Sequence, residues 1–291
     1  MKIGIFAKTF TVGPRSGSSV LDAVPKEQAL VPTVQELFQL ISGHGIRCVQ
    51  FNLSCAGLDT LPSRKPSAEL LREIITMAEQ TKVELSAISG TFNMAHPDPG
   101  TRQDNLQKFE FLCEAAARLR IPVITLCIGT RDLSDMWKWH PENDSQAAWD
   151  DMVRSIESSL VMAEKFGLIL AFEPERENIV NSAKRARKLL DDLANPRLRI
   201  IIDPANLIFP GCHQEEILDD TFAQLSDAIT IAHAKDRDRH FSPCAPGKGI
   251  LDFPYYVRCL KQSGFTGPLI MHGLEEYEVP SSRQFLAGLI G

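Results

Sequence analysis

The 291-residue sequence lacks the long apolar run that a membrane helix requires. No uninterrupted apolar stretch approaches the roughly 20 residues needed to span a bilayer. The N-terminus passes directly into an alternating segment, Lys2 to Ala7, without the apolar core and small-residue cleavage site of an export signal. We therefore expect a cytoplasmic protein with no membrane partner.

Nucleotide-binding loops and a basic face are also missing. The segment after the first apolar run, Ala7 to Phe10, contains no G-x-G-x-x-G, and no Walker loop occurs anywhere. Asp and Glu total 37 against 31 Lys and Arg, which gives a formal net charge of -6. Proteins that bind a phosphate backbone usually carry a basic face, so we expect no nucleic-acid partner.

The seven cysteines form no C-x-x-C pair and are widely scattered. Most of them lie inside apolar runs, where a thiol packs as a small hydrophobic group. An odd, scattered set without paired spacing is typical of reduced thiols in a reducing compartment. This pattern agrees with a cytoplasmic location.

Strand-like and helix-like segments alternate eight times along the chain, with no linker between them. The expected strands cover residues 2–7, 48–53, 84–89, 123–128, 168–173, 198–203, 228–233 and 269–272. The expected helices cover residues 34–42, 68–80, 147–166, 182–193, 214–224 and 282–289, with two more starting at Asp104 and Pro254. Residues 11–32 are expected to form a loop over one barrel mouth, and residues 132–144 an irregular lid. Strict alternation indicates a parallel sheet, and eight units predict a single-domain (β/α)8 TIM barrel over residues 1–291 rather than a doubly wound sheet.

Titratable residues follow four consecutive strands at the same relative place. Glu173, Asp203 and His233 are spaced by 30 residues each, which is about the length of one βα unit, and His272 ends the last strand. Barrel chemistry lies at the carboxyl ends of the strands, so these four side chains are expected to converge. Taken singly, each has a structural explanation, such as a helix cap, an Asx turn or a buried structural histidine.

Together the four residues predict a metal site. Two carboxylates and two imidazoles suit Mn²⁺, Zn²⁺, Co²⁺ or Fe²⁺ better than Ca²⁺, and Mg²⁺ stays an alternative. Four protein ligands leave coordination positions open for two substrate oxygens. We therefore expect a divalent-metal cofactor.

Five motifs carry a resemblance to a known family. They are Phe172-Glu173-Pro174-Glu175, Ile202-Asp203-Pro204-Ala205-Asn206, His233-Ala234-Lys235-Asp236, Pro246-Gly247-Lys248-Gly249 before Leu251-Asp252-Phe253, and Gly267-Pro268-Leu269-Ile270-Met271-His272-Gly273. With these motifs the chain resembles the sugar phosphate isomerase/epimerase superfamily, the xylose isomerase-like barrels. That group includes ketose 3-epimerases, inosose-processing enzymes and tri-zinc abasic-site endonucleases.

The resemblance implies metal ligation by Glu173, Asp203 and His233. It also implies a glutamate at the end of the eighth strand, where this sequence has His272. In the epimerase pattern, glutamates on strands five and eight move a proton between the two faces of a metal-bound enediolate. We therefore assign catalysis to Glu173 and His272. Asn206 stands where many relatives have a histidine, and with the acidic net charge this argues against the endonucleases.

Further residues are expected to bind substrate. The resemblance implies this role for Arg239, which follows the His-x-Lys-Asp motif, and we extend it to Glu175, Asn206, Lys235 and His96. Lys235 and Asp236 either contact substrate oxygens or pair with each other. Trp137 and Trp139 either line the pocket or pack the lid.

The sequence therefore predicts a divalent-metal-dependent isomerase or epimerase acting on a small sugar or polyol. Two alternatives stay open: a keto-polyol (inosose-type) dehydratase, and a non-catalytic metal- and sugar-binding barrel, which the histidine on strand eight motivates. No basic phosphate cradle is evident, which favours an unphosphorylated substrate. The sequence leaves a homo-oligomer open.

Overall fold

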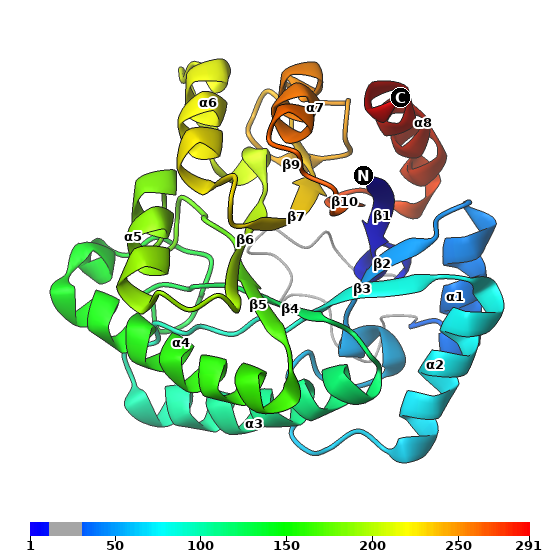
Figure 1. The fold of residues 1–291 in the computed structure, drawn as a ribbon, viewed down its shortest axis with the longest axis horizontal. Helices are drawn as coiled ribbons and strands as arrows, with labels where there is room; N and C mark the ends of the chain where they lie inside the picture. The colour runs from blue at the N-terminus through cyan, green and yellow to red at the C-terminus, as the bar shows by residue number, and fades with distance from the viewer. Residues whose placement is uncertain (12–30) are drawn as a thin grey trace.

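A computed structural model of the protein describes residues 1–11 and 31–291, and over these residues eight parallel strands close into a barrel (Figure 1). The strands are β1 (Lys2–Phe6), β2 (Cys48–Phe51), β3 (Glu84–Ser89), β4 (Val123–Leu126), β5 (Ile169–Phe172), β6 (Leu198–Ile202), β7 (Ile229–Ala234) and β10 (Pro268–Met271). Their order around the barrel is β1-β10-β7-β6-β5-β4-β3-β2. The predicted (β/α)8 fold is confirmed, and six of the predicted strands end one or two residues earlier.

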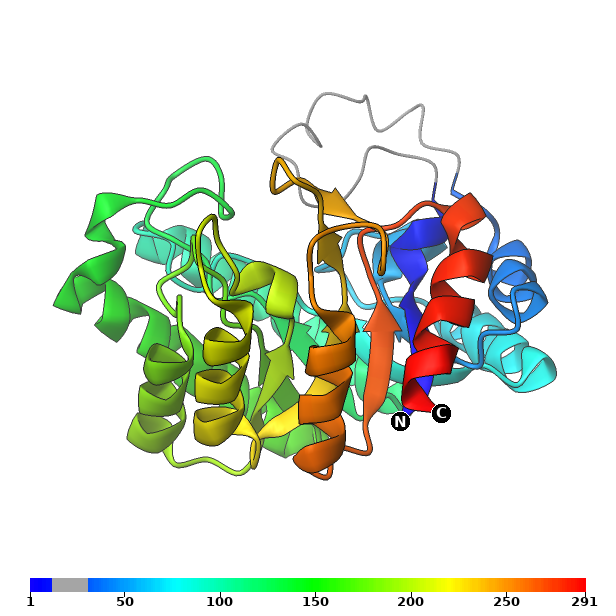
Figure 2. The same cartoon turned by 90° about the horizontal axis from the view of Figure 1, so that it is seen from above.

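Eight α-helices surround the strands. They are α1 (Val34–Gly43), α2 (Ala68–Thr81), α3 (Pro99–Arg118), α4 (Gln146–Phe166), α5 (Ala183–Leu193), α6 (Gln214–Leu225), α7 (Phe253–Gln262) and α8 (Val279–Ile290), counted over the described residues. None of these helices is long and apolar enough to cross a bilayer. Seen from above, β1 and β10 lie side by side and point the same way, and the two chain ends meet at the opposite side from the arrowheads (Figure 2).

The start of α3 differs from the prediction. Helix α3 begins at Pro99, not at Asp104, and Asp98 caps it by accepting a hydrogen bond from the Thr101 backbone N–H at 2.7 Å. Proline is favoured in the first turn because its missing N–H has no helical partner there. The apolar face of α3 begins only at Leu106, so periodicity could not show the polar first turn.

The loops agree only in part with the sequence. Most of the predicted loop 11–32 lies outside the described residues. The predicted lid, residues 132–144, contains turns and a single 3-10 turn at Pro141–Asp144. After β7 the chain forms a small antiparallel pair, β8 (Asp236–Arg237) with β9 (Pro243–Cys244), which the sequence did not indicate.

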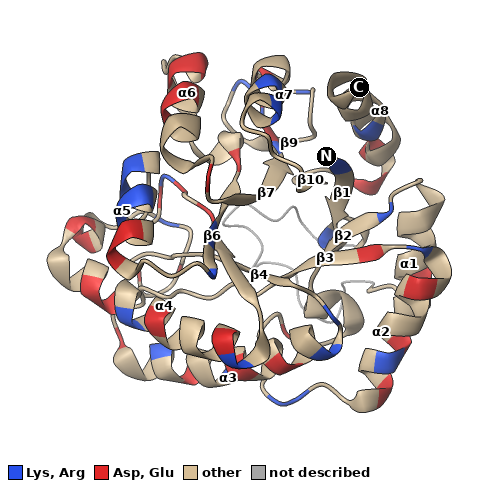
Figure 3. Ribbon diagram, viewed as in Figure 1, with Lys and Arg blue, Asp and Glu red and all other residues tan. Residues whose placement is uncertain are grey.

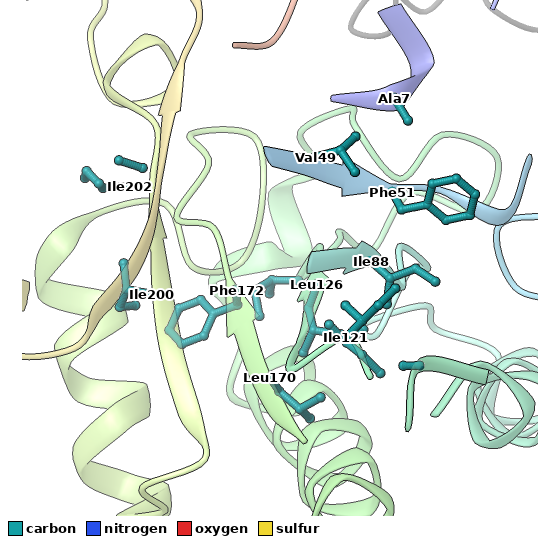
Figure 4. Close-up of a cluster of buried hydrophobic side chains, with 14 of the residues drawn as sticks. Ala7, Val49, Phe51, Ile88, Ile121, Leu126, Leu170, Phe172, Ile200 and Ile202 are labelled. Carbon is teal, nitrogen blue, oxygen red and sulfur yellow. The ribbon is translucent and has the colours of Figure 1, made fainter. Parts of the chain in front are cut away.

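Side chains alternate between the two faces of every strand. One set packs outward against the helices, and Figure 4 draws part of it, including Leu170 and Phe172 of β5 and Ile200 of β6. The other set fills the inside of the barrel with one apolar residue from each strand: Phe6, Cys48, Ala87, Val123, Ala171, Ile201, Ile231 and Ile270. Most charged residues lie on the outer helices (Figure 3). The barrel interior is therefore a packed apolar floor beneath the mouth.

Candidate metal centre and active site

A polar layer lies directly above the apolar floor of the barrel. Because side chains on a strand repeat every two residues, the next inward position on seven strands is two residues further on. Each of these seven positions holds a polar residue: Gln50, Ser89, Thr125, Glu173, Asp203, His233 and His272. The polar layer therefore lies between the packed apolar floor and the mouth of the barrel.

Glu173, Asp203 and His233 converge within the polar layer. One potential ligand atom from each residue lies within 4.8 Å of the others. His233 Nδ1 is 3.6 Å from Glu173 Oε2 and 3.8 Å from Asp203 Oδ2. Two ligands about 2.1 Å from one ion lie at most about 4.2 Å apart, so both separations allow a shared ion.

The donor set fits a divalent metal ion. His233 is buried, and its Nδ1 has no hydrogen-bond partner among the described residues. A buried polar atom without a partner is costly, and a metal ion between Nδ1 and the two carboxylates would supply that partner. One imidazole and two carboxylates suit Zn²⁺ and similar transition metals.

The fourth predicted ligand, His272, does not join this group. Its ring stacks on the His233 ring, with centroids 5.3 Å apart and an interplanar angle of 2°, and its other neighbour is Phe6 at 5.0 Å. Burial, with the nearby positive charge of Lys235, lowers the pKa of His272 well below its ordinary value. The geometry thus brings together three of the four predicted ligands, and His272 is a neutral imidazole stacked beside them.

Lys235 is part of the same buried network. Its Nζ lies 2.9 Å from Asp203 Oδ2 and donates to Asn206 Oδ1 at 2.6 Å, and Asn206 Nδ2 donates to Glu173 Oε1 at 2.6 Å. Burial alone would lower the pKa of Lys235, but the negative charges of Asp203 and Glu173 raise it overall. Lys235 therefore pairs with Asp203 and not with Asp236.

The carboxylates and the basic side chains of the cluster shift one another's pKa values. Burial would raise the pKa of Asp203, but Lys235 and His233 hold it well below its usual range. Burial would lower the pKa of His233, but the charges of Glu173 and Asp203 raise it to about 9. Burial and the Glu173 charge raise the pKa of Glu175 to about 8. At neutral pH Glu175 therefore holds a proton next to the carboxylate of Glu173.

A pocket of about 270 Å³ opens beside the cluster. Glu175, Asn206 and Arg237 line it, and Arg237 donates from Nη2 to Asn206 Oδ1 at 3.1 Å and from Nε to the Ala205 carbonyl at 2.7 Å. Arg239, the arginine expected to bind substrate, is exposed. The sequence therefore pointed to an arginine two residues away from the one that borders the pocket.

The other predicted pocket residues lie at the lid. His96 Nδ1 accepts a hydrogen bond from the Asp98 N–H at 3.1 Å, just ahead of α3. Its Nε2 lies 3.4 Å from the Leu133 carbonyl. Trp137 and Trp139 are about half exposed, and Trp139 borders a second pocket of about 480 Å³. The structure does not bring His96 into the carboxylate cluster.

Three polar residues of the layer were missed from the sequence. They are the uncharged Gln50, Ser89 and Thr125, and the Gln50 side chain contacts Ser89, Thr125 and His233. Their sequence positions could have identified them, because each lies two residues after an inward apolar residue of its strand. Glu173, Asp203, His233 and His272 have the same spacing. Neutral polar residues are common in short strands, so residue type alone does not mark these three as part of the site.

The protons held by the cluster predict how stability depends on pH in the metal-free protein. His233 (6.5 to about 9) and Glu175 (4.5 to about 8) both have raised pKa values in the folded state. Between the unfolded and folded pKa of each group, the folded state therefore binds more protons than the unfolded state. The free energy of unfolding consequently falls as pH rises from about 5 to about 9. Urea unfolding in EDTA across this range measures the slope. Glu175→Gln should flatten its lower part, and a stability that rises with pH would contradict the assignment.

A parallel (β/α)8 barrel with carboxylates and a histidine at the carboxyl ends of its strands belongs to the class of barrels that bind small molecules at this end. Residues 38–288 match the family model described as xylose isomerase-like TIM barrel, and the chain belongs to this family. A search of curated protein sequences finds no match.

Solved structures with the same fold are numerous but distant in sequence. A 3-keto-D-glucoside 4-epimerase of E. coli in its apo form is 17% identical, with a TM-score of 0.73 over 99% of both chains. The D-psicose 3-epimerase of Clostridium cellulolyticum H10 with D-tagatose is 15% identical, with a TM-score of 0.72 over 100% of this chain and 99% of the other. The IolI protein with a bound zinc atom is 15% identical, with a TM-score of 0.71 over 100% and 98%. At these identities the likeness establishes the fold.

Proposed function

We propose that the protein is a divalent-metal-dependent isomerase or epimerase of a small sugar or polyol. The observation that carries this proposal is the convergence of Glu173 and Asp203 on the unpartnered, buried Nδ1 of His233. Family membership supports it, as do the sugar epimerases among proteins with this fold. The bound zinc atom of the IolI protein supports the choice of a metal.

Glu173, Asp203 and His233 would hold the ion. When bound, it would supply positive charge that stabilises negative charge developing on substrate oxygens. Glu173 would take the proton from the carbon next to the substrate carbonyl, while Asn206 holds its Oε1 in place. The pair Lys235–Asp203 keeps the second carboxylate ionised and oriented.

Return of the proton requires a second group near the cluster. His272 is neutral and its buried Nδ1 has no hydrogen-bond partner among the described residues, so it would give its single ring proton to the opposite face of the substrate carbon, and exchange with solvent would then take the proton from Glu173 and return one to His272. Glu175 lines the pocket, and its pKa is raised in the metal-free protein; in its protonated form it would donate a hydrogen bond to a substrate oxygen. We assign the second proton transfer to His272 and substrate orientation to Glu175, Asn206 and Arg237.

The protonated Glu175 also favours a second candidate function. An acid beside the base Glu173 is the arrangement needed to remove a proton and expel a neighbouring hydroxyl as water. A keto-polyol dehydratase would use this pair. Its product would be lighter than the substrate by one water, whereas an epimerase or isomerase keeps the mass.

Incubation with Mn²⁺ and a panel of ketoses and inososes in D₂O tests the proposal. We expect one substrate to gain deuterium at the carbon next to its carbonyl, seen by NMR and mass spectrometry. Loss of water would select the dehydratase. Metal-dependent binding of a sugar with no exchange and no product would show a non-catalytic binding barrel and refute the proposal.

A further inference from the structure

Gln50 lies across the barrel from His233, the candidate metal ligand, and contacts the ring nitrogen that does not face the carboxylates. It lies on β2, which is separated from β7 by β1 and β10 in the strand order, and only 4% of its surface is exposed. Its Oε1 is 3.0 Å from His233 Nε2, the ring nitrogen that faces away from Glu173 and Asp203. This contact connects two sides of the polar layer.

Neighbouring hydroxyl groups can accept hydrogen bonds from the Gln50 amide when its oxygen faces His233. Its Nε2 lies 3.4 Å from both Ser89 Oγ and Thr125 Oγ1, which can accept its two N–H groups. Turning the amide over would place its NH₂ group against His233 Nε2. When Nδ1, which faces Glu173 and Asp203, ligates an ion, the ring proton lies on Nε2, so that arrangement would oppose two donors. The oxygen of Gln50 therefore faces His233.

This contact determines which nitrogen of His233 is free to ligate. A hydrogen bond from Nε2–H to Gln50 Oε1 keeps the proton on Nε2 and leaves the lone pair on Nδ1. Nδ1 is the atom that lies between Glu173 and Asp203 without a partner. We infer that Gln50 is a positioning residue that holds His233 in the ligating tautomer and ring orientation. This inference rests on the proposed metal centre.

The test is Zn²⁺ affinity of the whole protein, measured by competition with a chromophoric chelator. Partners that accept the second ring N–H of a metal-bound histidine typically contribute about 10–100-fold to affinity. We expect Gln50→Leu to weaken Zn²⁺ binding by about 10–100-fold. We expect Gln50→Glu to bind within about threefold of the wild type, since a carboxylate accepts the same bond and the hydroxyls can rotate to donate to it.

Two further variants separate positioning from packing. The double variant Ser89→Ala, Thr125→Val keeps Gln50 but frees its amide to rotate, and we expect a loss smaller than that of Gln50→Leu. Ser86→Ala is the matched control, since Ser86 is buried on neighbouring β3 and donates to the Val49 carbonyl without touching His233. It should bind Zn²⁺ like the wild type. Thermal melting of the metal-free variants verifies that each is folded.

A spectroscopic signal gives a second readout. In the Zn²⁺-loaded wild type we expect a slowly exchanging imidazole proton on Nε2 of His233 in ¹⁵N-resolved spectra, and its loss in Gln50→Leu. The inference fails if Gln50→Leu binds Zn²⁺ as tightly as the wild type, or if Gln50→Glu is as weak as Gln50→Leu. If the wild type itself binds no Zn²⁺, the proposed metal centre fails instead.

Discussion

Replacing Glu173 by glutamine, or His233 by alanine, should abolish tight divalent-metal binding. Each substitution removes one of the three proposed ligands that converge among the described residues, and the remaining two would not hold an ion firmly. Loss of a direct ligand should exceed the roughly 100-fold upper effect of losing a supporting partner. Elemental analysis of the purified proteins and Zn²⁺ titration measure the change.

The barrel should survive both substitutions. Glu173 and His233 lie in the polar layer above the apolar floor, so the packed core below keeps its contacts. Each substitution removes one partner of a buried charge cluster, so it should lower the stability of the metal-free protein without unfolding it. Glu177→Gln is a suitable control, since Glu177 is exposed in the loop after the same strand. Unchanged metal content in both site variants would show that the ion binds elsewhere.

The fold was predictable because its signal repeats. Eight apolar runs alternate with amphipathic segments, and the ligands after β5, β6 and β7 recur every 30 residues. Such a repeat ties Glu173, Asp203 and His233 to equivalent places at one end of a parallel barrel. Their convergence therefore followed from the strand positions without any knowledge of loops.

The details in which the structure differs from the expectation depend on contacts that periodicity cannot encode. The choice between Arg237 and Arg239 is made by the β8–β9 pair, which turns one side chain toward Asn206 and leaves the other exposed. Two arginines two residues apart look equivalent in the sequence. Likewise, the stacking of His272 on His233 depends on ring orientation across two strands, which a pattern of residue types does not specify.

Within the motif His233 to Asp236, Lys235 and Asp236 have separate roles, and the role of Asp236 leads to the largest stability effect that we expect. Lys235 turns inward to Asp203, whereas Asp236 is fully buried and organises the loop after β9. The Asp236 carboxylate accepts four backbone hydrogen bonds, from the N–H groups of Arg237, Gly247, Gly249 and Leu251, at 2.8 to 3.1 Å. One side chain thus satisfies a whole turn of backbone donors.

Asp236→Ala should therefore destabilise the protein by about 4 kcal/mol, since the buried N–H group of Leu251 and three partly buried N–H groups lose their charged acceptor. Asp236→Asn keeps one oxygen and should cost about half as much. Urea unfolding measures both. Asp227→Ala serves as the control, because the Asp227 side chain is 71% exposed and its ion pair with Arg187 should contribute less than about 1 kcal/mol.

The same loop explains why glycine occupies position 249. A Cβ there would lie 2.1 Å from the Arg237 carbonyl oxygen and 2.4 Å from Asp236 Oδ1, so even alanine would push the loop away from the carboxylate. Gly249→Ala should thus lower stability in the same direction as Asp236→Ala, and the double variant should cost less than the sum because both break one network. Additive losses, or an Asp236→Ala variant within about 1 kcal/mol of the wild type, would show that the carboxylate does not hold the loop.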